Sequence, residues 1–536
     1  MVLAAIAIVV GILLGESMFG AGVLFRLIPM FLLIAAFVVF VILKKTRRFS
    51  FIAIGILIGF LGICGVNDIY SANTKIGTYE GVIQGRVSGE ITVDEDGIRF
   101  FIEDVYAGDE KLKYEAYVVL TNFDEYDIDF NAGDTVTLVG TLKANEHKPF
   151  DSYHAYDVAK KEGYVVYSSY VEKVAEGELH PLERIPYKIK QNFYSRLDSD
   201  TAGICTALIL GDKEGLDENL YDDISSSGLA HVLAVSGLHI TTLSTALFFI
   251  LRKSKINSKV ALVIVFLITL FYCFLCDFTA SSLRALIMMT ILNFATAFGK
   301  KKDTLSSISL AAVLILAFRP TALFESGFLM SFSAVLGIVF FFGKFHVTGM
   351  KLVRKISPEK HYGKIVSEGV SLSLSANVGT YPFVAYFFGK IPVLFMLSNL
   401  IILPYLMFIY VFLLINTVFS LIVCWTGNLI LFKFLLLPFR MYVLAIGSLS
   451  FATVPVAISV IGIVGFFIVM LLVSRFVFLT FKERAILSVI IITVALALSA
   501  VVGYVDALKT QDVEVEEEAR ILIQTAVARG KTLLRI

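Results

Sequence analysis

Long, nearly uncharged stretches of 18 or more residues recur along this chain from Met1 to Tyr504. Inside a bilayer the backbone has no water to bond, so apolar runs of this length are typical of membrane-spanning helices. Only 17% of the residues are charged and 57% are hydrophobic, which is too little charge to cover a soluble domain of 536 residues. The sequence therefore predicts a polytopic α-helical membrane protein and excludes a disordered chain or a single soluble domain.

Basic residues in short loops predict how the chain is oriented. The basic loop 44–48 lies between the apolar segments 23–43 and 50–66, and loops of this kind stay in the cytoplasm. We therefore expect a cytoplasmic N-terminus and extracytoplasmic residues 70–228. Later basic loops fall on the cytoplasmic side if every apolar segment between them crosses once; they lie at 252–259, 300–302 and 344–364.

This reading gives about 13 transmembrane helices, although residues 393–447, with Pro404 and Pro438, also allow a re-entrant pair. The charged, amphipathic stretch Ile185–Asp223 is expected to lie on the outer surface of the membrane. We divide the chain into N-terminal transmembrane helices at 1–70, an extracytoplasmic β domain at 71–180, an outer-surface helical region at 181–228, a transmembrane domain at 229–505 and a short extracytoplasmic tail at 506–536.

The β domain has the composition of a soluble insert. Between residues 67 and 200 there are 26 Asp/Glu and 14 Lys/Arg, a net charge of −12, while the rest of the chain carries +13. The insert has no cysteine, so it must fold without disulfides. Alternating stretches bounded by turn residues predict five strands: Glu80–Val87, Ile98–Val105, Tyr114–Leu120, Thr135–Leu142 and Tyr164–Val171. Five strands in this length favour a small β-barrel of OB type.

Aromatic residues in the insert admit two interpretations. Phe100, Phe101, Tyr114 and Tyr117 would either form a face on which nucleic-acid bases stack or belong to the core and rim of the barrel. The acidic net charge argues against a strong nonspecific grip on phosphates.

Polar residues within the apolar segment 229–251 are candidates for function, since placing such groups in hydrocarbon costs about 3 kcal/mol or more. His231 and His239 are about 80° apart around a helix, and Ser236 falls on the same side as His239. Gly237 permits either a close backbone approach or a break. The set either lines a water-filled path or forms interhelical hydrogen bonds.

Arg284 lies just inside another apolar run, where it would pair with Asp277 or extend to the outer interface. Asn377 and Asn399 are amides at membrane depth, close to prolines that include Pro404. Amides and prolines there indicate broken helices, which are tolerated where they line a cavity or pack in protein.

Catalytic and cofactor motifs point away from an enzyme. Ser236 and His239 are a formal nucleophile and base, but neighbours on one helical turn seldom aim at each other. The sequence has no nucleotide-binding Gly-x-x-x-x-Gly-Lys motif and no His-Glu-x-x-His helix, and Cys273 and Cys276 lack partners at metal-site spacing. We expect no cofactor, no metal and no catalysis.

The segment 208–240, LILGDKEGLDENLYDDISSSGLAHVLAVSGLHI, resembles the signature of the ComEC family of bacterial competence proteins. Blocks at 278–289, 319–338 and 375–404 follow in the family's order, and the resemblance covers roughly 1–505. It implies a channel in the bacterial cytoplasmic membrane that imports single-stranded transforming DNA. The positions that match the family are Gly211, Asp212, His231, Ser236, Gly237, His239, Arg284 and Gly327. Our pore candidates are His231, Ser236, Gly237, His239 and Arg284, to which intramembrane polarity adds Asn377 and Asn399. The architectural candidates are Gly211, Asp212, Gly327 and the helix-breaking Pro404.

Two departures from the family pattern stand out. Leu329 replaces a glutamine, and residues 506–536 form a short tail where many members continue into a metallo-β-lactamase-like domain. Either the nuclease is a separate protein or the reading frame is truncated. We expect a separate nuclease, together with a DNA receptor on the outer side and a cytoplasmic motor or helicase; a homo-oligomer is left open. Two other functions compete with the channel: a transporter of a smaller anionic or lipid-linked substrate, and an intramembrane hydrolase that uses Ser236.

Overall fold

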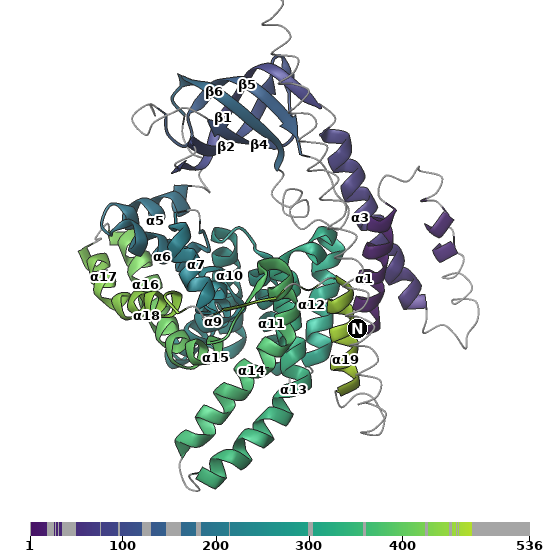
Figure 1. Cartoon of the computed structure of the whole chain (residues 1–536), viewed down its shortest axis with the longest axis vertical. Helices are drawn as coiled ribbons and strands as arrows, with labels where there is room; N and C mark the ends of the chain where they lie inside the picture. The colour runs from purple at the N-terminus through teal and green to yellow at the C-terminus, as the bar shows by residue number, and fades with distance from the viewer. Residues whose placement is uncertain are drawn as a thin grey trace, which may run out of the picture. The chain divides into compact units, whose positions relative to one another are not determined.

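The computed structural model describes the following residues (Figure 1): 2–18, 26, 28–30, 32–34, 50–74, 77–94, 97–120, 130–145, 162–177, 184–213, 215–297, 304–356, 361–423, 427–449, 453–456, 458 and 460–473. The chain divides into two compact units, one of residues 1–332 with 392–452 and one of residues 333–391 with 453–536. The predicted crossing at 485–504, the tail and most of the segment 23–43 lie outside the described residues.

The insert is a β-sheet, and all five predicted strands are confirmed. The strands are β1 (Thr78–Asp94), β2 (Gly97–Ala107), β4 (Glu115–Leu120), β5 (Thr135–Ala144) and β6 (Glu162–Ala175), with a short β3 (Glu110–Lys111). β1 pairs antiparallel with β2 and β5, β2 pairs antiparallel with β4, and β6 pairs antiparallel with β5 and parallel with β4. Each of the five long strands therefore has two partners, and their alternating apolar residues share one core.

The turn at 131–134, which precedes β5, is built around one carboxylate. Asp134 is buried and accepts hydrogen bonds from the backbone N–H of Asn131 (2.8 Å) and of Gly177 (3.0 Å), and the Lys173 ammonium lies 3.0 Å away. Burial alone would raise the pKa of Asp134, but the two N–H groups and Lys173 outweigh it and hold the pKa below its usual value. Gly133 supplies the positive φ of +100° that the turn requires.

The aromatic side chains of the insert divide between the two interpretations. Phe100 is 1% exposed and packs in the core against Phe130, with ring centroids 5.1 Å apart. Phe101 and Tyr117 lie opposite each other on β2 and β4 and stay half-buried, with centroids 4.9 Å apart. Tyr114 packs against Tyr70 of the preceding helix. Only the Phe101–Tyr117 pair keeps the position that a base-stacking face requires.

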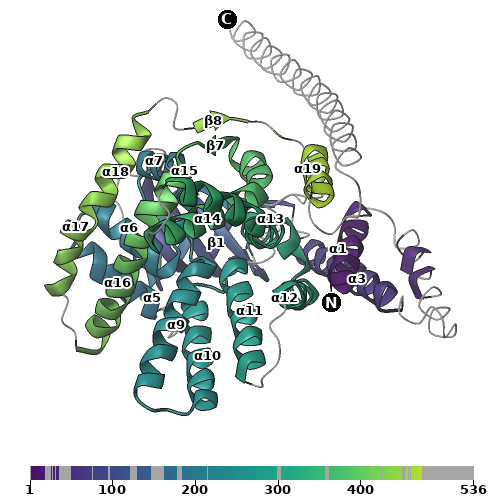
Figure 2. The same ribbon diagram turned by 90° about the horizontal axis from the view of Figure 1, so that it is seen from below.

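The first helices, α1 (Val2–Ser17) and α3 (Ser50–Asn73), pack closely side by side (Figures 1 and 2). Glycines make the approach possible: a Cβ added to Gly11 would lie 2.0 Å from the Ile56 carbonyl oxygen, and one added to Gly59 would lie 2.2 Å from that of Ile8. Each helix places two such glycines four residues apart, which is the small-residue pattern of tightly packed membrane helices.

The helices that follow the insert form the core of the first unit. They are α5 (Arg184–Tyr194), α6 (Ser199–Leu210), α7 (Glu218–Ser226), α8 (Ala230–Leu233), α9 (Gly237–Lys253), α10 (Ser258–Leu275), α11 (Ala280–Ala297), α12 (Thr304–Phe318), the 3-10 turn η3 (Pro320–Phe324) and the start of α13 (Ser326–Ile356). The same unit contains α15 (Phe395–Leu397), the π-helical turn η4 (Ser398–Ile402), α16 (Leu403–Val423), η5 (Gly427–Ile430), α17 (Leu431–Leu435) and α18 (Leu437–Gly447).

The position of the stretch Ile185–Asp223 at the outer surface of the membrane stays a prediction, but the stretch is not amphipathic throughout. Every residue of α6 from Thr201 to Leu210 is buried within the protein. The charges belong to the flanking helices α5 and α7, and they concealed an apolar run between them. A helix that is apolar all round belongs inside a fold, and α6 packs in one core with α9, α10 and α16.

The second unit contains α13 from Ser333 onward, α14 (His361–Phe388), the strands β7 (Lys390–Pro392) and β8 (Thr453–Pro455), and α19 (Val460–Val473). The predicted loop 344–364 is mostly helical, because α13 runs on to Ile356 and α14 begins at His361. The two helices touch at glycines: a Cβ on Gly379 would lie 2.1 Å from the Ser333 carbonyl oxygen.

Among the described residues, four helices are long and apolar enough to cross a membrane: Ile52–Asn73, Ser258–Leu275, Ser326–Val353 and Phe395–Leu421. Shorter apolar helices include α1, α6, α12 and α18. Apolar helices of these lengths are typical of a helical membrane protein. The number of crossings stays a prediction.

Candidate functional site

The site begins where α6 ends. Gly211 takes the left-handed conformation (φ +79°) that closes α6, and its N–H donates to the Ala207 carbonyl at 2.9 Å. A Cβ on Gly211 would lie 3.1 Å from the backbone nitrogen of Val235. Gly211 therefore lets the end of α6 pack against the segment that precedes α9. Beside it, Asp212 forms an ion pair with Lys190 of α5.

The segment predicted as one helix at 229–251 is interrupted. α8 ends at Leu233, Ala234 and Ser236 have extended backbones, and α9 begins at Gly237. His231 is exposed on α8, where its Nδ1 lies 3.1 Å from the Gly228 carbonyl oxygen. The two histidines therefore do not lie on one continuous helix. This corrects the expectation that His231 and His239 stand about 80° apart around a single helix. The break expected as one role of Gly237 is present.

His239 is fully buried in the first turn of α9. Its Nδ1 lies 3.1 Å from the Ser236 backbone nitrogen and 3.0 Å from Ser236 Oγ. Because Nδ1 accepts the backbone N–H, we assign the proton of the neutral ring to Nε2, which has no hydrogen-bond partner among the described residues. The ring meets the Tyr410 ring of α16 edge-on, with centroids 4.6 Å apart. His239 thus fixes the start of α9 and is closed off from solvent.

The contact between Ser236 and His239 corrects the expectation that they would not aim at each other. Ser236 is the N-cap residue of α9 rather than part of its helix, so its side chain points back along the first turn toward His239. The reciprocal contact is that of a capping box. Among the described residues no carboxylate orients the imidazole through Nε2, as a Ser-His-Asp triad requires.

Arg284 of α11 lies against this same turn. Its side chain is buried (8% exposed), and its Nη2 is 2.9 Å from the place that a Cβ on Gly237 would occupy. Its guanidinium lies over the Phe332 ring, 5.8 Å from the centroid, and Nη1 lies 3.7 Å from the Met288 sulfur. No described carboxylate comes within ion-pair distance of Arg284, and its Nε has no partner there.

Neither expected state of Arg284 is therefore found. The predicted pair with Asp277 does not form, and the side chain does not extend to an interface. Asp277 is exposed in the turn between α10 and α11, where Asp277 and Phe278 both take positive φ values (55° and 45°). Consecutive left-handed residues other than glycine store strain, which proteins retain mostly at functional sites. This turn sets where α11, and with it Arg284, begins.

A second polar contact joins η4 to the loop before α8. The Ser398 hydroxyl donates to the Ser227 carbonyl and lies 2.7 Å from the Tyr442 hydroxyl of α18. Pro404 follows in the first turn of α16, where its missing N–H is tolerated. The predicted break near Pro404 is thus a π-helical turn in a continuous helix, with Asn399 half-buried in it.

The remaining candidates lie apart. Asn377 belongs to α14 of the second unit, where its Nδ2 donates to the Ser373 carbonyl one turn earlier (2.8 Å). Gly327 is near the start of α13, and no atom lies within 4 Å of the place of its missing Cβ. The structure therefore brings together Gly211, Ser236, Gly237, His239 and Arg284, and not the whole predicted set.

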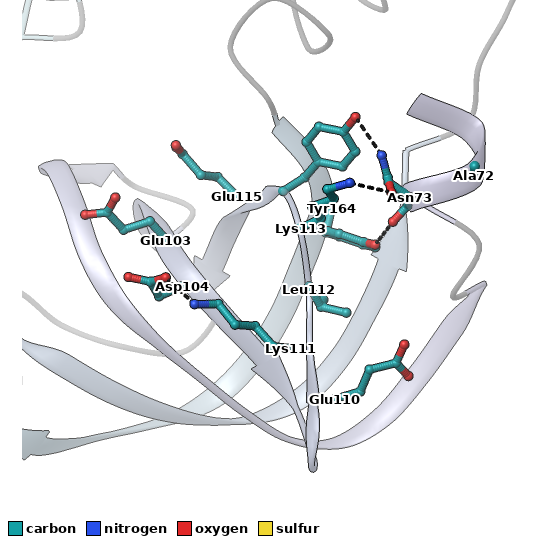
Figure 3. Close-up of a pocket in the computed structure, with 11 residues that line it drawn as sticks. Ala72, Asn73, Glu103, Asp104, Glu110, Lys111, Leu112, Lys113, Glu115 and Tyr164 are labelled. Atoms are coloured by element: carbon teal, nitrogen blue, oxygen red, sulfur yellow. Dashed lines mark hydrogen bonds and ion pairs between the residues drawn. The ribbon is translucent and has the colours of Figure 1, made fainter. Parts of the chain in front are cut away.

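A separate pocket of about 630 Å³ lies where α3 meets the sheet (Figure 3). Asn73, at the end of α3, accepts hydrogen bonds from Tyr164 (2.8 Å, to its carbonyl) and from Lys113 (3.3 Å, to its side chain). The lining includes Glu103, Asp104, Glu110 and Glu115 beside two lysines. This acidic lining is unsuited to a DNA phosphate, and no group of three metal-binding side chains occurs among the described residues.

Several contacts at the site were not predictable from sequence. Tyr410, Ser398 and Tyr442 come from helices far along the chain, and Phe332 lies in an ordinary apolar run. Ser398 could have been recognised as a candidate from the sequence, because it is a serine within an apolar helix. An aromatic residue such as Phe332 could not, because it is one of many.

The fold and the site define a helical membrane protein in which a buried arginine packs against the start of an interrupted helix. Residues 208–442, which contain the site, match the family model described as Competence protein. ComE operon protein 3 of Bacillus subtilis (strain 168) is 26% identical over 214 residues, which are 40% of this chain and 26% of that protein. Over the residues that contain the site, the chain is therefore similar to competence proteins. The matched stretch spans about a quarter of that relative, and no solved structure matches the chain.

Proposed function

We propose that the protein imports single-stranded transforming DNA across the bacterial cytoplasmic membrane during natural competence. The observation that carries this is the family match at 208–442, because it contains the interrupted helix and Arg284. An ionised side chain buried within apolar helices is costly and is retained where function requires it. A strand with one negative charge per phosphate needs positive groups along its path.

The proposal extends to the arrangement of the chain. About 13 crossings would place the N-terminus in the cytoplasm and residues 70–228 outside. The insert would be an OB-like barrel, supported by the two partners that each long strand has. Its Phe101–Tyr117 pair offers a surface on which a base can stack.

The chain would act as a conduit, with no cofactor and no catalysis of its own. The Ser236–His239 contact is explained by the helix cap, so a hydrolase is not favoured. Import then needs other proteins, which we propose to be an outer DNA receptor, a separate nuclease and a cytoplasmic motor or helicase. A transporter of a smaller anionic or lipid-linked substrate is the competing function, because a buried arginine also suits such an anion.

The test is delivery of labelled transforming DNA to the nuclease-protected cytoplasm. A null strain of the source bacterium would be complemented with the wild-type chain, with His239→Ala or with an empty vector, at equal protein levels in the membrane. We expect the wild type to restore delivery and His239→Ala to reduce it, because the start of α9 would be released. Normal DNA uptake by the null strain would refute the proposal and favour the transporter.

A further inference from the structure

The start of α9 and the Arg284 guanidinium place positive charge at the same point. The first turn of a helix carries N–H groups without helical acceptors and the positive end of the helix dipole. Arg284 has its Nη2 2.9 Å from the missing Cβ of Gly237, the first residue of α9. Two positive features in contact repel each other unless an anion lies between or beside them.

The described part of the chain supplies little to offset this charge. Among its residues, the Phe332 ring and the Met288 sulfur contact the buried guanidinium, and no carboxylate is within ion-pair distance. A thioether is a weak acceptor, and an aromatic ring binds the guanidinium through its face. The N–H groups at the edge of the guanidinium therefore have capacity for a further acceptor.

The position of Arg284 also depends on Gly237. A Cβ at residue 237 would lie 2.9 Å from Nη2, so any larger residue there would make the guanidinium shift away from the helix backbone. The turn is also accessible, because Gly237 is half-buried and the neighbouring Leu238 is 41% exposed. Ser236 and His239 form the capping box of the helix and hold this turn in place.

We propose that the first turn of α9 and Arg284 form a binding subsite for one phosphate of the translocating DNA strand. A planar guanidinium donates two parallel N–H bonds to phosphate oxygens, and a helix N-terminus adds backbone N–H groups to the same anion. The identity of the phosphate as that of DNA rests on the proposed function. The subsite would contact the backbone of the strand and not its bases, so import would not depend on sequence.

The experiment measures binding of a fluorescent oligothymidylate to the purified full-length chain in maltoside detergent, by anisotropy over a series of salt concentrations. The variants are Arg284→Gln, which removes the charge, and Gly237→Ala, which displaces the guanidinium and keeps it. Arg196→Gln is the matched control, because it makes the same substitution at an exposed arginine. A methylphosphonate oligonucleotide of the same sequence tests whether the backbone charge is what binds.

We expect both site variants to bind roughly tenfold more weakly than the wild type, since hydrogen bonds to charged groups are the strong ones. The slope of log K against log salt should flatten by about 0.7 in Arg284→Gln, the value for one phosphate of a single strand. Arg196→Gln should match the wild type, and the methylphosphonate should not bind. Thermal unfolding of each variant shows that it is folded.

Four results would overturn the subsite. Unchanged affinity and slope in Arg284→Gln would leave DNA import standing but without this contact, as would equal binding of the methylphosphonate. Stabilisation by added phosphatidylglycerol that is lost in Arg284→Gln, with DNA binding unaffected, would assign the site to a lipid phosphate. No DNA binding by the wild type, together with normal uptake in the null strain, would remove the proposed function as well.

Discussion

Replacing Gly59 by alanine should separate α1 from α3. The new Cβ would lie 2.2 Å from the Ile8 carbonyl oxygen, whereas ordinary contacts begin near 3.4 Å, so the helices must part by at least about 1 Å. A gap of that size loses roughly a quarter to a half of each dispersion contact along the interface. Overpacking of this kind costs about 1–3 kcal/mol, and here the upper end is expected because the obstacle is backbone.

Gly65 in the same helix provides the control. Beyond its own stretch of helix, none of the described residues comes within 4 Å of its missing Cβ, so Gly65→Ala should be neutral or gain up to about 1 kcal/mol from helix propensity. The two variants would be heated at the same rate, and the fraction of each that stays monodisperse would be measured by size-exclusion chromatography. We expect Gly59→Ala to lose its monodisperse fraction roughly 5–10 °C below Gly65→Ala. Equal temperatures would refute the close approach of α1 and α3.

Three further predictions follow from single residues. Arg284→Met should raise the apparent unfolding temperature, by about 1–3 kcal/mol of stability, because it removes a buried charge that has no counterion among the described residues; a lower temperature would mean that the fold itself uses the guanidinium. Asp134 has a depressed pKa in the folded state, so its stabilising contribution is present above its unfolded pKa of about 3.9 and is lost as the pH falls through the folded value. Acid unfolding of Asp134→Asn should therefore lack this part of the pH dependence, and an unchanged acid profile would contradict it. Gly211→Ala should destabilise the protein by about 1–2 kcal/mol in thermal unfolding, because alanine disfavours φ +79° and its Cβ would press on Val235.

The insert was the most readable part of the sequence. Alternation of apolar and polar residues is a local signal, and it located all five long strands, from β1 to β6. The pairing of these strands depends on contacts between residues far apart in the sequence. Few arrangements of five short strands, however, let all of them bury their apolar residues in one core. The same local reading failed for α6, because charges on both sides of Thr201–Leu210 dominated the window.

The candidate site was predicted in residue type but not in arrangement. Ser236, Gly237 and His239 drew attention because polar groups are costly in apolar segments. Their geometry depends on the break at Ala234–Ser236, and no proline marks that break. The partners of the site come from far away: Ser398 reaches Ser227 across 171 residues. Such contacts are set by packing of the whole unit, and a single sequence does not reveal them.

The link between α3 and the sheet has a consequence for anything the insert holds. Tyr70 of α3 donates to the Glu162 carbonyl at 2.9 Å, and Tyr164 of the sheet donates back to Asn73. A module on a flexible tether spreads its ligand over the whole volume that the tether can sweep, and the local concentration falls as the tether lengthens. A module fixed to the last turn of a helix sweeps almost no volume. A strand held by the insert would therefore be presented to the membrane at one place and at a high effective concentration.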